Sequence, residues 1–248
     1  MKKSVNHSLE IINNWFIQRL GHKNFVKFIV LTRSRSGSSF LMSLLASHPN
    51  IKTYGEYFRR LNNRSYQDML DYVFSPKFRQ IKAVGFKIFY NHPYDTNSDD
   101  FWSYLASIND LKIIHLIRKN FLRTFISRKI ADITDQWFLC GNKFYDKEVR
   151  LTINPQELQN SYNKYQNLQR QRIALFDSRQ VLEIFYEEMI ADLDSQFHTI
   201  TNFLNVPFII PKSNLIKQNA RILREIVENY DELRVYFRGT ELSVFFSE

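Results

Sequence analysis

The chain has 248 residues, of which 44% are hydrophobic and 15% are aromatic, and it carries a net charge of +9. This length and apolar content are enough for one sizeable packed domain. Six glycines and six prolines are too few for collagen-like, linker-like or low-complexity material.

Cysteine usage and hydropathy limit the compartment. A single cysteine, Cys140, cannot form an internal disulfide, and no cluster of Cys and His has the spacing of a metal site. We therefore expect a reducing, cytoplasmic location and no metal. No apolar run reaches about 18 residues, and residues 1–21 lack the apolar centre of a signal peptide. The sequence predicts neither a membrane-spanning helix nor a leader.

The positive charge is concentrated in the first half of the chain. Residues 1–130 hold 21 Lys and Arg against 8 Asp and Glu, whereas residues 131–248 hold 13 against 17. An anionic ligand is therefore expected in the first half. Nucleic acid, an anionic membrane or a phosphorylated small molecule would each satisfy that charge.

Apolar runs alternate with amphipathic segments along the chain. A β-branched and aromatic strand is predicted at 25–32, a polar turn at 33–39 and an apolar helix at 40–47. Further strands are predicted at 83–90, 111–117 and 180–186, and further helices at 99–108, 120–134, 154–177, 194–204 and 223–237. Strands separated by helices predict an α/β three-layer sandwich with a central parallel sheet.

No repeat or flexible linker divides the sequence, so we expect a single domain over residues 1–248. Residues 1–24 are expected to form a helical extension, and residues 135–153, which lack periodicity, a lid or substrate loop. The helix from 154 has a strong start signal, with Asn154 as N-cap, Pro155 at the first helical position and Glu157 at the third.

The turn at 33–39 has the composition of a phosphate-binding loop. A turn between a strand and a helix directs backbone N–H groups at an anion, and the helix dipole adds about 0.3 to 1 kcal/mol. Gly37 allows close backbone approach, and Arg33 and Arg35 add charge and forked donors. It is not a Walker A motif, because Ser38 follows Gly37 where the lysine would stand. A serine-rich turn with solvated arginines is the alternative interpretation.

A second anion anchor is predicted where the strand at 111–117 ends. Arg118 stands at its carboxyl end, where open α/β sheets bind ligands, and Ser127 lies nine residues later on the following helix. Arginine offers bidentate contact to phosphate, and serine an oriented donor. Two such anchors on neighbouring strands favour a bis-phosphorylated nucleotide. A surface arginine with a helix-interior serine is the alternative.

Several blocks in this order resemble sulfotransferases that use 3′-phosphoadenosine 5′-phosphosulfate (PAPS), most closely small bacterial Stf-type and nodulation-type carbohydrate sulfotransferases. The resemblance covers roughly residues 25–245. The blocks are residues 32–41, 47–51 with 55–58, 85–88, 112–118 with 120–127, 185–188, 203–206, 217–219 and 229–230.

The resemblance implies a fold like that of P-loop nucleoside-triphosphate hydrolases, PAPS as co-substrate without a metal, and a hydroxyl of a carbohydrate or glycolipid as acceptor. It assigns the 5′-phosphosulfate to the first loop and the 3′-phosphate to the second anchor. The implied nucleotide-binding residues are Arg33, Ser34, Arg35, Ser36, Gly37, Ser38, Ser39, Phe40, Arg118, Ser127 and Lys217. Whether Lys119 shares the role of Arg118 stays open, because the spacing from Arg to Ser is one residue longer than is common.

Glu56 is the candidate general base for the acceptor hydroxyl, because similar sulfotransferases carry a carboxylate in a matching Gly-Glu-x-Phe segment. A positioned base contributes about 10² to 10⁴ in rate. The alternative is a surface glutamate paired with Arg59 or Arg60.

Three further residues have candidate roles in transfer. Arg35 would stabilise the leaving phosphate, and Lys87, on the predicted strand at 83–90, would steer donor or acceptor. His92 is the rival base, although a histidine after a strand is more commonly a turn residue bonded to backbone.

Two other functions remain as alternatives. A P-loop nucleotide or sugar kinase should show a Walker A lysine and an acidic Mg²⁺ ligand, and neither is evident. A noncatalytic module for RNA or an anionic membrane would explain the basic half, but it predicts interleaved aromatics or a basic amphipathic helix. We expect a carbohydrate or glycolipid partner, no nucleic acid and no stable membrane insertion, and a homodimer is compatible with the sequence.

Overall fold

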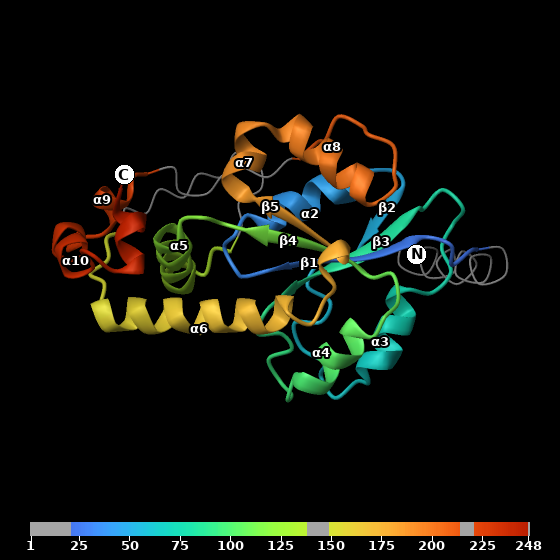
Figure 1. Cartoon of the computed structure of the whole chain (residues 1–248), viewed down its shortest axis with the longest axis horizontal. Helices are drawn as coiled ribbons and strands as arrows, with labels where there is room; N and C mark the ends of the chain where they lie inside the picture. The colour runs from blue at the N-terminus through green and yellow to red at the C-terminus, as the bar shows by residue number, and fades with distance from the viewer. Residues whose placement is uncertain (1–20, 138–148, 214–220, 248) are drawn as a thin grey trace, which may run out of the picture.

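The computed structural model describes residues 21–137, 149–213 and 221–247, and these form an α/β fold around a parallel sheet (Figure 1). Within those ranges the sheet has five strands in the order β2-β3-β1-β4-β5. The strands are β1 (Val26–Thr32), β2 (Ile51–Thr53), β3 (Ala83–Phe89), β4 (Lys112–Ile117) and β5 (Val181–Phe185). Each neighbouring pair runs parallel, which confirms the predicted parallel sheet.

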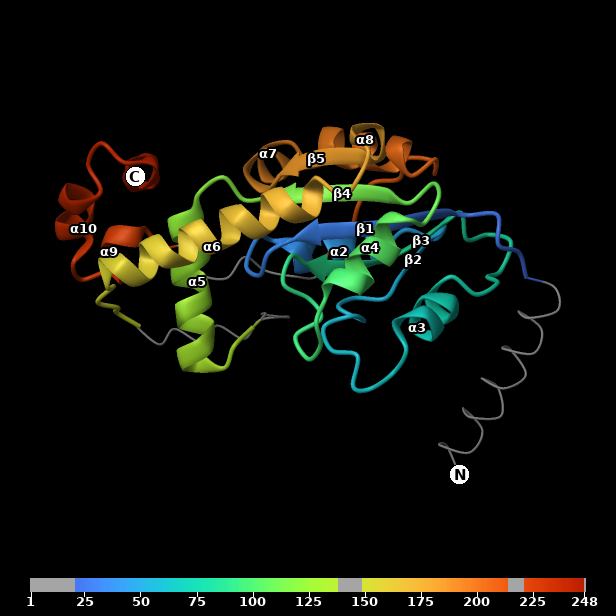
Figure 2. The same cartoon turned by 60° about the horizontal axis from the view of Figure 1, so that its bottom comes forward.

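Helices cover both faces of the sheet, which confirms the predicted three-layer arrangement (Figures 1 and 2). One face carries α2 (Ser38–Ala46), α7 (Tyr186–Ala191) and α8 (Leu193–Phe203). The other carries α3 (Tyr66–Val73), α4 (Asp99–Ala106) and α6 (Pro155–Ile173). The remaining described elements are α5 (Phe121–Thr134), α9 (Leu223–Ile226), α10 (Tyr230–Tyr236) and the 3₁₀ turns η1 (Ser178–Gln180) and η2 (Glu241–Phe246).

The central strand β1 serves two cores, because successive side chains of a strand point to opposite faces. Phe28 and Val30 pack with the helices α2 and α8, whereas Ile29 and Leu31 pack with α3 and α4. All four side chains are fully buried. This double burial explains why β1 reads as a continuous apolar run in the sequence.

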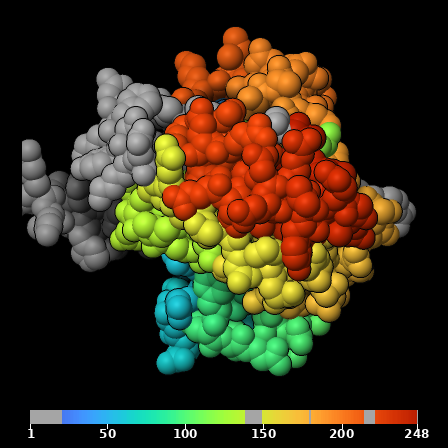
Figure 3. Space-filling view, turned by 90° about the vertical axis from the view of Figure 1, so that its left-hand side faces the viewer, coloured from blue at the N-terminus to red at the C-terminus, as the bar shows by residue number. Residues whose placement is uncertain are grey.

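A third core lies beyond the carboxyl ends of the strands, where α5 meets α6 and the C-terminal helices. Phe121, Leu158 and Leu233 are buried in it. Figure 3 views this end of the molecule and shows the C-terminal segment beside α6. This core positions α5, which carries Ser127 of the predicted second anchor.

The four long strands and most helices confirm the sequence predictions, but three short elements were missed. The strand β2 has three residues and pairs only with β3 within the described ranges, from Ile51 opposite Ala83. The helix α3 lies at Tyr66–Val73, where the sequence pattern predicts neither a helix nor a strand. The helix α7 starts directly after β5, without a turn to signal it.

The single helix predicted at 223–237 is wrong, because the backbone becomes extended between α9 and α10. Val227 has φ −100° and ψ 109°. The Leu151 N–H donates to the Ile226 carbonyl at 2.8 Å, and the Glu228 N–H donates to the Leu151 carbonyl at 2.9 Å. This bridge takes the backbone groups that a continuous helix would have used internally.

The helix α6 starts as predicted and ends earlier than predicted. The Asn154 side chain accepts from the Glu157 N–H at 3.1 Å, so Asn154 is the N-cap, and Pro155 stands in the first turn. The helix ends at Ile173 instead of continuing to 177, because the chain then turns through η1 into β5.

The predicted lid and N-terminal extension fall largely outside the described residues. Of the predicted loop at 135–153, Leu151 and Ile153 are buried in the third core. Of residues 1–24, the described part includes His22, which forms an antiparallel bridge with Lys77. Among the helices that the structure describes, none combines the length and apolar character needed to cross a membrane.

The contact between β1 and β3 at Gly85 gives a stability prediction. A Cβ at Gly85 would lie 2.2 Å from the Phe28 carbonyl oxygen, which belongs to the sheet backbone and cannot yield. We expect Gly85→Ala to lower the free energy of unfolding by about 1 to 3 kcal/mol, measured by urea denaturation. Ser103→Ala, at an exposed position of α4, is the control and should change it by less than about 0.5 kcal/mol. An unchanged urea midpoint for Gly85→Ala would contradict this packing.

Candidate functional site

The loop between β1 and α2 has the backbone of an anion-binding turn. Gly37, the N-cap of α2, has φ 88°, and Arg35 has φ 64°. A Cβ at Gly37 would lie 2.2 Å from the ring of Tyr186, so the position requires glycine for two reasons. Left-handed residues in such a turn direct successive N–H groups toward one point, where an anion binds.

The serines of this loop divide into structural and accessible groups. Ser36 is fully buried, and its hydroxyl lies 2.7 Å from that of Thr32, which donates to the Leu116 carbonyl at 2.6 Å. Ser38 is also buried, whereas Ser39 is exposed. The side chains of Ser36 and Ser38 therefore help to build the loop, and their backbone N–H groups remain the relevant donors.

Arg35 connects the two predicted anchors. Its Nε donates to Ser127 Oγ at 2.9 Å, and its carbonyl oxygen accepts from Arg118 Nη1 at 3.0 Å. A guanidinium N–H of Arg35 also donates to the Trp137 carbonyl. The structure thus brings Arg35, Arg118 and Ser127 into one cluster at the carboxyl ends of β1 and β4.

Repulsion between cations is visible in this cluster. Burial, reinforced by Arg118 and Arg128, lowers the pKa of Arg35 to about 10, and Asp132 only partly opposes them. Arg128 lies close to the loop, with Nη1 3.5 Å from Ser34 Oγ. An anion placed here would reduce both the burial cost and the repulsion, so the electrostatics of the cluster favour an anionic ligand.

Arg33 faces away from the centre of the loop. Its guanidinium donates to the Arg118 carbonyl at 3.0 Å and to Thr124 Oγ1 at 3.1 Å, and it lies 4.7 Å from the ring of Phe121. Burial lowers its pKa to about 10. Arg33 therefore connects the loop to α5 through its hydrogen bond to Thr124. Arg35 is the loop arginine that contacts Arg118 and Ser127.

The two basic residues that follow β4 point in different directions. Arg118 lies over the ring of Tyr186 at 4.8 Å and contacts the loop, whereas Lys119 pairs with Glu188 at 2.6 Å. Glu187 accepts from the Lys119 N–H at 3.0 Å, at the start of α5. The geometry favours Arg118 alone as the anchor.

Glu56 and Lys87 form an ion pair beside the loop. Glu56 Oε1 lies 2.8 Å from Lys87 Nζ, which donates to Ser39 Oγ at 3.4 Å. Lys87 is 5% exposed, while the Glu56 side chain is 30% exposed. Glu56 therefore pairs with Lys87, not with Arg59 or Arg60, and Lys87 connects it to Ser39 at the start of α2.

His92 is enclosed and neutral. It is fully buried, and its Nδ1 lies 3.3 Å from the Phe89 N–H, which donates to it. Burial, with Arg59 and Lys87 nearby, lowers the pKa of His92 to about 3. This is the turn histidine bonded to backbone that the sequence analysis gave as the common outcome, and Glu56 is the more accessible of the two candidate bases.

The remaining sequence predictions have separate outcomes. Phe40 is half-buried on α2 and packs at the edge of the core formed by α2 and α8. Lys217 lies outside the described residues. Among those residues, no group of three or more His, Cys, Asp or Glu side chains could hold a metal ion.

Sequence reasoning missed the contribution of the segment after β5. Tyr186 packs on Gly37 and under Arg118, and Glu187 accepts from the backbone at the start of α5. The aromatic and acidic residues directly after a strand were a visible signal. Their partners, however, lie more than 60 residues away in the chain, so these contacts cannot be predicted from the local sequence pattern.

Comparisons with known proteins found similarity to one protein family and to relatives that extend over most of the chain. A family model described as the sulfotransferase family matches residues 104–209, which include β4, Arg118 and Ser127. Nodulation protein H of Rhizobium meliloti (strain 1021) is 26% identical over 236 residues, which cover 88% of this chain and 94% of that protein. Nodulation protein H of Rhizobium tropici is 26% identical over 235 residues, covering 88% and 92%.

The fold has a counterpart among solved structures. The crystal structure of a sulfotransferase from Alicyclobacillus acidocaldarius superimposes with a TM-score of 0.50 at 15% sequence identity. The match covers 85% of this chain and 90% of that one. This likeness supports the fold class predicted from the sequence.

The contact between Gly37 and Tyr186 can be tested by a double-mutant cycle. We expect Gly37→Ala to destabilise the protein by about 2 kcal/mol or more, because the added methyl group meets the ring and the backbone is left-handed. Tyr186→Ala should reduce that penalty, with a coupling of about 0.5 to 3 kcal/mol. Urea denaturation of the four proteins gives the coupling. Strict additivity would show that the ring and the glycine do not meet.

Proposed function

From the similarity of residues 104–209 to the sulfotransferase family, we propose that the chain is a sulfotransferase that transfers a sulfuryl group from PAPS to a hydroxyl of a carbohydrate or glycolipid. The observation that carries the proposal is the junction of Arg35, Arg118 and Ser127 between the ends of β1 and β4. It is a site for more than one negative charge, built on the elements that the motifs assign to the two ends of the nucleotide.

The residues present fit such a nucleotide. The backbone N–H groups of residues 36–39, with Arg35, would hold the 5′-phosphosulfate, and Arg118 and Ser127 the 3′-phosphate. The repulsion among the clustered guanidinium groups supports this assignment, because a dianionic ligand would neutralise it. PAPS supplies the sulfuryl group when bound.

We assign proton transfer to Glu56. Its carboxylate would take the proton of the acceptor hydroxyl as that oxygen bonds to sulfur, in line with the sulfur–oxygen bond to phosphate that breaks. Lys87 pairs with the carboxylate at 2.8 Å and, with Arg35, would stabilise the charge that develops on the departing phosphate. His92 is less suited, because it is fully buried and its Nδ1 already accepts from backbone.

Two observations support a carbohydrate acceptor. The motifs resemble those of nodulation-type carbohydrate sulfotransferases, and two relatives named nodulation protein H cover 88% of the chain. A kinase of the P-loop type is less well supported, because the position after Gly37 holds Ser38, whose side chain is buried.

Nucleotide binding tests the two-anchor site. We expect Arg35→Ala and Ser127→Ala each to weaken binding of adenosine 3′,5′-bisphosphate by about tenfold or more, because hydrogen bonds to charged groups contribute about 1.5 to 3 kcal/mol. Titration calorimetry without added metal gives the affinities. Arg238→Ala and Ser103→Ala, both at exposed positions, are the matched controls. Wild-type affinity in both site variants would refute the map, and tighter binding of Mg-ATP or of RNA would favour the alternative functions.

The rate of sulfuryl transfer tests whether Glu56 is the general base. We expect Glu56→Gln to lower sulfuryl transfer by about 10² or more, with affinity for adenosine 3′,5′-bisphosphate near that of the wild type. Radiolabelled PAPS with extracted cellular glycans measures the transfer. Glu232→Gln, at an exposed position of α10, should keep full turnover. If Glu56→Gln remains active, the base is elsewhere, and His92→Gln becomes the variant to assay.

A further inference from the structure

Three tyrosines form an aromatic surface on either side of Glu56. The Tyr57 ring stacks on that of Tyr72, with centroids 5.8 Å apart and planes at 25°. Tyr54 contacts both rings edge-on, at 6.0 Å and 5.9 Å. Tyr72 is 58% exposed, so much of its ring is open to solvent.

Cations surround these rings without carboxylate partners. Lys52 and Lys77 each lie 5.7 Å from the centre of the Tyr54 ring, and Arg64 lies 5.5 Å from that of Tyr57. Within the described part of the chain, none of the three forms an ion pair. Burial, with Lys52 and Lys23 nearby, lowers the pKa of Lys77 to about 8. The exposed Lys52 and Arg64 therefore add positive charge to this surface, whereas the buried Lys77 donates to the Ser75 carbonyl and hydroxyl oxygens at 2.7 and 2.8 Å.

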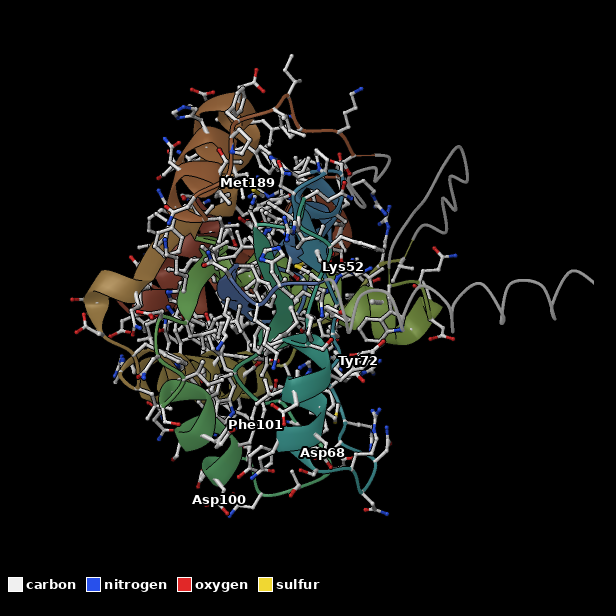
Figure 4. The ribbon with its side chains drawn as sticks, turned by 90° about the vertical axis from the view of Figure 1, so that its right-hand side faces the viewer. Lys52, Asp68, Tyr72, Asp100, Phe101 and Met189 are labelled. Atoms are coloured by element: carbon white, nitrogen blue, oxygen red, sulfur yellow. The ribbon has the colours of Figure 1, made fainter. Side chains whose placement is uncertain are left out.

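The aromatic surface is continuous with the site. Tyr54 and Tyr57 flank Glu56 in the chain, and the carboxylate of Glu56 reaches Lys87 and, through it, Ser39 of the loop. The surface extends from there along β2, at the edge of the described sheet, to the exposed side of α3. Figure 4 views the molecule from the end opposite α5 and labels Lys52 on β2 and Tyr72 on α3.

Resting on the proposed function, we propose that the surface formed by Tyr54, Tyr57 and Tyr72 with Lys52 binds the non-reacting sugar units of a negatively charged oligosaccharide, whose hydroxyl then lies at Glu56. The open face of Tyr72 suits the apolar C–H face of a pyranose ring, as flat aromatic anchors do in other recognition sites. The exposed Lys52 and Arg64 suit carboxylate or sulfate groups on that chain. A neutral oligosaccharide would use the rings and leave these charges uncompensated.

Binding of two defined oligosaccharides tests the proposal. The probes are a hyaluronan tetrasaccharide, which carries glucuronate carboxylates, and the neutral chitin tetraose, titrated calorimetrically into the full chain with adenosine 3′,5′-bisphosphate present. We expect the wild type to bind the anionic probe more tightly. Tyr72→Ala should weaken binding of both probes by about fivefold or more. Lys52→Gln should weaken only the anionic probe, by about threefold.

Matched controls come from the opposite end of the molecule. Tyr236 on α10 is 60% exposed, and Lys164 on α6 is exposed, so Tyr236→Ala and Lys164→Gln remove the same groups elsewhere. Both controls should bind like the wild type. The proposal is overturned if the wild type binds neither probe, if it binds them equally, or if Tyr72→Ala and Lys52→Gln behave like their controls. Tighter binding of single-stranded RNA than of the anionic probe, lost in Tyr72→Ala, would also overturn it.

Failure of this inference is distinguishable from failure of the proposed function. Nucleotide affinity and sulfuryl transfer from radiolabelled PAPS to cellular glycans are measured on the same variants. If the wild type transfers sulfuryl groups and Tyr72→Ala changes neither KM nor kcat, the proposed acceptor surface is refuted. The proposed sulfotransferase activity then still stands. If the wild type neither binds the nucleotide nor transfers sulfuryl groups, the proposed sulfotransferase function is refuted.

Discussion

The crowding of guanidinium groups at the carboxyl ends of β1 and β4 is the constraint on which the site depends. Arg35 bonds to Ser127 through its side chain and to Arg118 through its backbone, so the first loop and α5 hold each other in place. The same contacts bring cations close enough to lower the pKa of Arg35. An anion with two charged ends, such as the proposed nucleotide, would reduce this repulsion on binding.

The sheet order explains why these residues meet. β1 lies between β3 and β4, so the loop after β1 is flanked on one side by Lys87 and on the other by Arg118. Tyr186, from the end of β5, closes over Gly37. The loop after β1 is thus connected to Glu56 through Lys87 and to Ser127 through Arg35, an arrangement that would suit the proposed transfer reaction.

Residues that act through local chemistry could be predicted from the sequence, and residues that act through distant partners could not. The apolar run of β1, the glycine turn and the Asn154 cap were predictable because each depends on a few neighbouring residues. The pairing of Glu56 with Lys87 depends on the register of β2 against β3, and the break at Val227 depends on Leu151, 76 residues earlier. Neither partner is apparent from the local sequence pattern.

The most direct test of the two-anchor site is a crystal structure of the protein with adenosine 3′,5′-bisphosphate. We expect the 5′-phosphate to lie against the backbone N–H groups of residues 36–39 and the 3′-phosphate to lie within hydrogen-bond distance of Arg118 and Ser127. Phosphates located away from both positions, with Arg35 still hydrogen-bonded to Ser127, would refute the two-anchor site.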